Sequence, residues 1–152
     1  MEPAVQQWVR AVLRIRNDDG SSGSCFVIDA HRGLLWTCAH VIDEQDAPAK
    51  VGERRRIGVE PAEGEPVEWM YTAEVLWASR SHHAADDNLD GALLVIRAAI
   101  EGLNAIESNL TWPLMHADGG ELPSLALGDD TKLVRGESTI LVLGYPGATS
   151  FR

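Results

Sequence analysis

The alternation of apolar and polar positions near the N-terminus predicts short β-strands. Residues 12–16 (VLRIR) alternate apolar and charged side chains, as a strand with one buried face does. Two further apolar runs follow at 24–28 and 34–38, each preceded by turn-forming residues. We therefore predict three strands in succession, the second and third joined as a hairpin through residues 29–33.

The same rhythm continues along the rest of the chain. The pattern predicts further strands at 55–60, 68–79, 91–96 and 138–145, and a short helix near 98–107. Polar and glycine-containing loops separate these runs. So many short strands with turn residues between them indicate an all-β protein, either a sandwich or a barrel.

Composition and net charge limit the kinds of molecule that this protein is expected to bind. The chain has 152 residues, 45% of them hydrophobic and 24% charged, which is typical of one folded domain. Its net charge of −10 argues against nucleic acid or an anionic membrane as a partner, because both require a basic surface. No apolar run reaches the roughly 18 residues of a membrane span, and the first residues lack the pattern of a secretory signal. We therefore expect an intracellular protein.

The two cysteines and one polar loop are candidate metal or redox groups. Cys25 and Cys38 lie on adjacent predicted strands, so a disulfide is an alternative to the reduced thiols that are usual inside cells. The loop HHAADD (82–87) contains residue types that bind divalent ions, but it has neither cysteine partners nor helical spacing. We interpret it as a solvated loop, and we expect neither a cofactor nor a metal.

Three separated stretches carry the strongest functional signal. Residues 23–42 (GSCFVIDAHRGLLWTCAHVI) contain a strand, a hairpin and a T-x-A-H-V block. Residues 87–96 (DNLDGALLVI) place an aspartate directly before an apolar strand. Residues 125–147 (LALGDDTKLVRGESTILVLGYPG) end in a GYPG turn. Together and in this order they resemble the trypsin-like serine proteases, most closely the HtrA/Deg type.

This resemblance implies a fold and two site residues. The fold is an antiparallel six-stranded β-barrel, the N-terminal half of the trypsin-like double barrel, over residues 1–127. Residues 128–152 are then the inter-barrel linker and the first strand of a second barrel. His40 matches the catalytic histidine and Asp90 the triad acid.

The chemistry explains why these residue types are required. A serine hydroxyl needs an adjacent base near neutral pH, and a carboxylate holds the imidazole of that base in one tautomer and stabilises its cation. Asp86 and Asp87 compete with Asp90 for the second role, because they lie in the same loop. The position of Asp90 immediately before the apolar strand favours it.

The nucleophile implied by the resemblance is missing from these residues. The family carries it in a G-[DN]-S-G-G block beyond the inter-barrel linker, and this sequence has no such block. Ser21 and Ser22 precede the histidine strand, and Cys25 and Cys38 lie on predicted strands upstream of His40, so none of the four is a suitable substitute. We expect the N-terminal portion of a serine endopeptidase that acts on polypeptides and is inactive without the rest.

Two other classes of function stay open at this point. A protease-like module without catalysis would bind peptides or protein partners through the exposed inter-barrel face. That face and the unpaired strand 138–145 would also favour self-association or a second covering chain. The third possibility is a small β-barrel binding domain whose motifs are coincidental.

Overall fold

The computed structural model describes residues 3–45, 47–79, 90–103, 106–126, 128 and 144 of the chain. Within them the elements are α1 (Pro3–Arg10), β1 (Val12–Arg16), β2 (Ser22–Asp29), β3 (Leu34–Thr37), α2 (Ala39–Ile42), β4 (Arg54–Val59), β5 (Glu68–Ala78) and β6 (Ala92–Ala99). Neither of these two helices has the length and apolar character that a membrane crossing requires.

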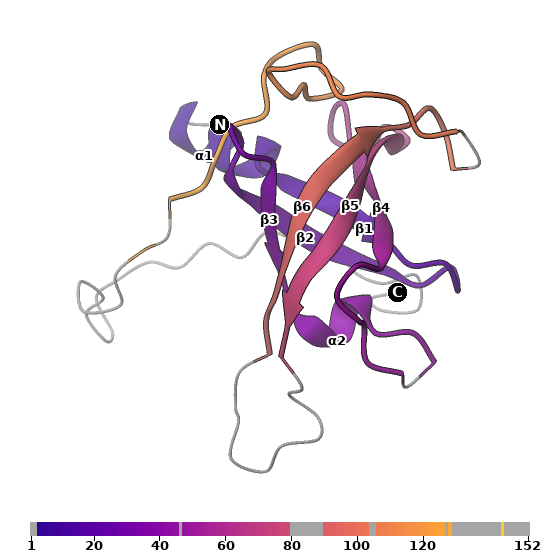
Figure 1. Cartoon of the computed structure of the whole chain (residues 1–152). Coiled ribbons are helices and arrows are strands. Elements are labelled where there is room, and N and C mark those ends of the chain that lie inside the picture. The colour runs from indigo at the N-terminus through magenta and orange to yellow at the C-terminus, as the bar shows by residue number, and fades with distance from the viewer. Residues whose placement is uncertain are drawn as a thin grey trace.

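The six strands close into one antiparallel barrel (Figure 1). Their order around the barrel is β1-β2-β3-β6-β5-β4, and β4 pairs back onto β1 with Ile57 opposite Ile15. The predicted all-β fold and the six-stranded antiparallel barrel are confirmed, and each predicted strand from 12–16 to 91–96 overlaps an observed one. The predicted strand at 138–145 and the predicted unit 128–152 lie, apart from Gly128 and Gly144, outside the described residues.

The helix predicted near 98–107 is wrong for the residues that the structure describes there. β6 continues through Ala98 and Ala99, which pair with Thr72 and Tyr71 of β5. Ala98 is buried against the barrel, so pairing with the neighbouring strand overrides the helix propensity of alanine. The sequence pattern also failed to predict the two helices that do form, α1 and α2.

Alternate side chains of the strands fill the barrel. β1 and β3 alternate buried and partly exposed positions along their whole length, as a strand with one inward face does. Large inward side chains with no exposed surface include those of Leu13, Val27, Leu35, Ile57 and Leu94. Burying a side chain of this size stabilises a fold by about 1.5–3 kcal/mol, so the wall of the barrel is a firm support for groups at its ends.

The two ends of the barrel carry different additions. α2 lies at one end, whereas α1 and the segment 106–126 lie at the other (Figure 1). Arg10, the last residue of α1, donates from Nε to Asp118 Oδ2 over 2.8 Å and fastens the segment to the helix. Tyr71 fastens it to the barrel, because its hydroxyl donates to Met115 O at 3.0 Å and accepts from Met115 N at 2.9 Å.

Candidate active site

The candidate site begins where β3 ends. The hydroxyl of Thr37, the last residue of β3, donates to the carbonyl of Ser24 on β2 at 2.6 Å. Cys38 keeps an extended backbone, with φ −77° and ψ 141°, and α2 starts at the next residue. His40 is the second residue of α2, so the strand end fixes the base of its side chain within three residues.

Side chains from distant segments hold both ends of α2. A helix of four residues has no stability of its own, because its terminal N–H and C=O groups lack partners inside the helix. At the N-terminal end, the N–H of His40 donates to Asp90 Oδ1 at 3.0 Å. At the C-terminal end, Asn17 Nδ2 donates to Val41 O at 2.8 Å and Arg55 Nη2 donates to Ile42 O at 2.7 Å. These three contacts, together with the buried side chains of Ala39 and Ile42, support the helix.

Asn17 and Arg55 are buried, which makes their contacts with α2 firm. Each side chain is 2% exposed. Arg55 also donates to Glu53 Oε2 at 2.9 Å, so the Glu53 carboxylate partly compensates the buried positive charge of Arg55. A buried hydrogen bond is costly to break, because both groups lose their partner without regaining water.

The chain returns to this end of the barrel at Asp90, just before β6. Ser79 and Gly91 bridge the two sides of the loop that precedes it: the Ser79 N–H donates to Gly91 O at 2.8 Å, and the Gly91 N–H donates to Ser79 Oγ at 3.0 Å. Gly91 lies against the indole of Trp36, since a Cβ built on Gly91 would be 2.3 Å from Trp36 Cζ2. The backbone on which Asp90 sits is thus fixed from two sides.

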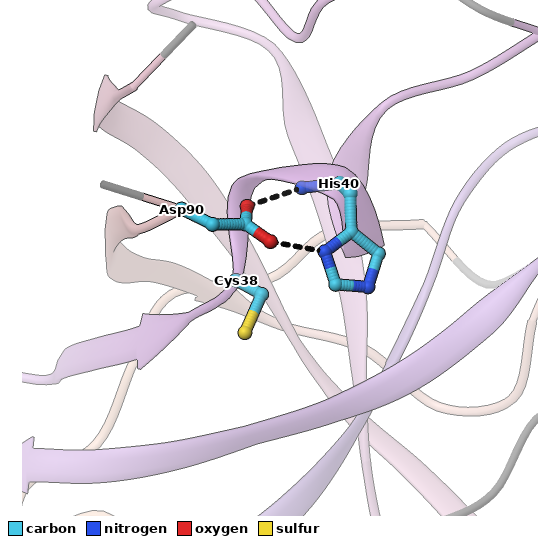
Figure 2. A group of neighbouring side chains, drawn as sticks. All are labelled: Cys38, His40 and Asp90. Atoms are coloured by element: carbon cyan, nitrogen blue, oxygen red, sulfur yellow. Dashed lines mark hydrogen bonds and ion pairs between the residues drawn. The ribbon is translucent and has the colours of Figure 1, made fainter. Parts of the chain in front are cut away.

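His40 and Asp90 meet at this point (Figure 2). Asp90 uses one carboxylate oxygen for each part of His40: Oδ1 accepts from the backbone N–H, and Oδ2 is hydrogen-bonded to ring Nδ1. A carboxylate can only accept, so the contact assigns the proton to Nδ1 and leaves Nε2 with its lone pair. The His40 side chain is 65% exposed and that of Asp90 35%, so the free nitrogen is accessible to a reacting group. The structure therefore brings together the two residues that the sequence singled out.

Cys38 lies beside the pair (Figure 2). Its Sγ, a ring nitrogen of His40 and a carboxylate oxygen of Asp90 all lie within 4.8 Å of one another. Burial and then the Asp90 charge raise the pKa of the Cys38 thiol, and burial raises the pKa of Cys25 to about 12. Both cysteines are free thiols, as expected for reduced residues. Because the thiolate is the reactive form of cysteine, these pKa shifts argue against either as a nucleophile.

The remaining sequence candidates are accounted for differently. Ser21 donates to Asp19 Oδ1 and Ser22 accepts from Arg14, and neither hydroxyl hydrogen-bonds to His40 within the described part of the chain. Asp86, Asp87 and the loop 82–87 lie outside the described residues.

Sequence reasoning missed the residues that support α2 and the backbone beside Asp90. Nothing in the pattern marked Asn17, Arg55 or Ser79, because each acts on a segment at least a dozen residues away.

A closed antiparallel barrel that presents a carboxylate-oriented histidine at one end is suited to activating a nucleophile. Residues 23–152 match the profile of the trypsin-like peptidase domain, and the chain belongs to that family. Among curated proteins no match was found. Membership of this family indicates a peptidase, hence a hydrolase, in general terms.

Proposed function

We propose that this protein is a serine endopeptidase of the HtrA/Deg type in which His40 is the general base and Asp90 the orienting carboxylate. The observation that carries the proposal is the double contact of Asp90 with His40, one oxygen on the backbone N–H and the other on ring Nδ1. Two contacts from one carboxylate fix both the position of the residue and the plane of its ring. The substrate class is a polypeptide.

In the proposed reaction each proton has a defined carrier, and the orientation of the His40 ring supports the assignment. Nε2 of His40 accepts the proton of a serine hydroxyl as the oxygen attacks the peptide carbonyl, and the imidazolium that forms keeps its Nδ1–H on Asp90 Oδ2. The same Nε2–H then protonates the leaving amine, and an acyl-enzyme remains. A water molecule activated by Nε2 hydrolyses that ester and regenerates the serine.

The serine and the oxyanion donors belong, in this proposal, to polypeptide other than residues 1–152. These residues hold no G-[DN]-S-G-G block, and no described serine hydroxyl hydrogen-bonds to His40. In the proposed division, 1–127 is the barrel that carries the base and 128–152 leads toward the second barrel. Residues 1–152 by themselves are therefore expected to hydrolyse peptide bonds negligibly, since nucleophile and oxyanion stabilisation supply most of the rate.

The test uses the full-length gene product. Its transcript is read past codon 152 for an in-frame G-[DN]-S-G-G serine, and the purified protein is assayed on fluorescein-labelled casein. His40→Ala is expected to lower kcat/KM by about 10⁴-fold or more, whereas His31→Ala, a histidine in the exposed turn before β3, serves as the matched control. Absence of hydrolysis by the parent protein, or parental activity in His40→Ala, would overturn the proposal.

A further inference from the structure

Cys38, His40 and Asp90 form the one cluster of three metal-ligating side chains found among the described residues. Thiolate, imidazole and carboxylate together are the donor set that zinc prefers, and magnesium or calcium would require an all-oxygen site. The three side chains come from two separate segments, the start of α2 and the second residue before β6 (Figure 2). The tertiary fold, and not local sequence spacing, brings them together.

We propose that these three residues bind a zinc-class divalent ion, and that the bound ion disables the His40–Asp90 pair. The ligands are Cys38 Sγ, Asp90 Oδ2 and His40 Nδ1, the ring nitrogen that faces the carboxylate. Three protein ligands leave the fourth tetrahedral position to water. The site itself stands on geometry alone, and only its consequence for peptide hydrolysis rests on the proposed function.

The distances suit such a site after small side-chain rotations. Ligand atoms around tetrahedral zinc lie roughly 3.4–3.7 Å apart, given bond lengths of about 2.0–2.3 Å. Sγ lies within 4.8 Å of the other two ligand atoms and has to approach by about 1 Å, and His40 Nδ1 has to move away from Asp90 Oδ2 to admit the ion. His40 is 65% exposed and Cys38 is exposed, so these rotations disturb no core packing.

Metal binding would move two protons, and these movements would remove the ability of His40 to act as a base. The thiol proton of Cys38 leaves to solvent as the sulfur binds the ion. The ion takes the lone pair that His40 Nδ1 gains when its proton departs, and the neutral imidazole then carries its proton on Nε2. The nitrogen that has to accept a proton from the nucleophile is thereby already protonated, and Asp90 no longer orients the ring.

The first test is titration of the protein with Co²⁺, whose thiolate complexes show a sulfur-to-cobalt charge-transfer absorption in the near ultraviolet. The parent protein and Cys25→Ala, which removes the buried thiol, are expected to show the band, and Cys38→Ala to lack it. Zn²⁺ should bleach the band by displacement, because zinc binds such sites more tightly than cobalt. Loss of a direct ligand in Asp90→Ala should weaken binding beyond the roughly 10–100-fold typical of outer-shell changes. A band that persists in Cys38→Ala, or no band in the parent, overturns the site.

The second test follows the ring of His40 by ¹⁵N-edited NMR with Zn²⁺ alone, in a protein whose fold is checked by circular dichroism. The metal-free ring should show its proton on Nδ1, and the zinc-bound ring on Nε2, with no such exchange in Cys38→Ala. An unchanged tautomer in zinc-saturated protein would contradict the proposed effect on the pair. Neither readout requires hydrolysis, so failure of the metal site and failure of the peptidase proposal are distinguishable.

Discussion

Each end of the barrel pairs a histidine with a nearby aspartate, and the two pairs have opposite characters. His40 is largely exposed and its Nδ1 hydrogen-bonds to the Asp90 carboxylate. His116 is 5% exposed, and its Nδ1 accepts the backbone N–H of Asp118 at 3.1 Å. The Asp118 carboxylate, 3.2 Å from the same nitrogen, is held instead by Arg10. Of the two pairs, only the first leaves one ring nitrogen accessible while the other is hydrogen-bonded to a carboxylate.

The electrostatics of the second pair follow from this arrangement. Burial lowers the pKa of His116, and this outweighs the Asp118 charge that would raise it. The hydrogen bond from Arg10 lowers the pKa of Asp118. We therefore regard His116 as neutral, with Nδ1 as an acceptor, and not as the cation of an ion pair. Proximity of a histidine to an aspartate does not by itself define a catalytic pair; the direction of the hydrogen bond and the exposure of the other nitrogen distinguish the candidate pair from the structural one.

The largest expected effect is a difference in kcat/KM between substitutions of the two aspartates. Asp90→Asn keeps the shape of the side chain but loses the charge and favours the wrong tautomer, so kcat/KM of the full-length gene product on labelled casein should fall by about 10⁴-fold. Asp118→Asn should leave kcat/KM within about twofold, because the segment 106–126, which carries Asp118, lies at the other end of the barrel (Figure 1). Comparable losses in both variants would remove the distinction drawn between the two pairs.

The next prediction compares two residues that hold segments in place at opposite ends of the barrel, Asn17 and Tyr71. Asn17→Ala deprives Val41 O of its buried donor, and Tyr71→Phe deprives Met115 of both partners. Each change should lower the free energy of unfolding by about 1–3 kcal/mol in urea titrations. Only Asn17→Ala should also lower kcat/KM, on the order of 10–100-fold, because it releases α2 and misplaces His40. Equal effects on activity would contradict the role assigned to Asn17.

A smaller effect is expected at Arg10. Its contacts with Asp118 are partly exposed, so Arg10→Ala should lower the free energy of unfolding by only about 0.5–1 kcal/mol. Arg32→Ala, which removes a more exposed 3.4 Å contact with Asp29, is the control and should change stability less. The same ranking should be seen when the two variants are compared by thermal unfolding.

The smallest effect is a pH dependence that belongs to His116. Its pKa in the fold lies below the ordinary histidine value of 6.5 that it regains on unfolding, so the unfolded chain binds more protons between those two pKa values. This contribution to stability is complete above about pH 6.5 and is lost as the pH falls through the lowered pKa. In urea titrations at a series of pH values, His116→Asn should show a shallower loss of stability on acidification than the parent. An identical pH slope in the two proteins would refute this.

The strands and the His40–Asp90 pair were predictable because their signals are local or carried by motifs. VLRIR alternates with the period of a strand, and β1 occupies the predicted residues 12–16. The pairing of His40 with Asp90, 50 residues apart, was implied by family resemblance, and no periodicity indicated it.

The parts that escaped prediction depend on contacts between distant residues. α2 has no capping side chain at Cys38, and the N–H of His40, its second residue, donates to Asp90, which lies 50 residues further along the chain. Ala98 and Ala99 favour a helix in isolation, but in the fold they pair with β5 and form part of a strand. In both cases the conformation is decided by a contact with residues that are distant in the sequence, which a local sequence pattern does not include.

Gly91 makes the candidate site sensitive to a substitution at a residue that takes no part in its chemistry. The residue binds nothing in the proposed reaction, yet the space where its side chain would begin is filled by the Trp36 ring. An alanine there would force the ring or the start of β6 to move, and Asp90 is the neighbouring link of the chain. A codon change that adds one methyl group could therefore misdirect the acid while the barrel stays folded. If His40 and Asp90 act as proposed, an alanine at position 91 is expected to lower activity although the barrel stays folded.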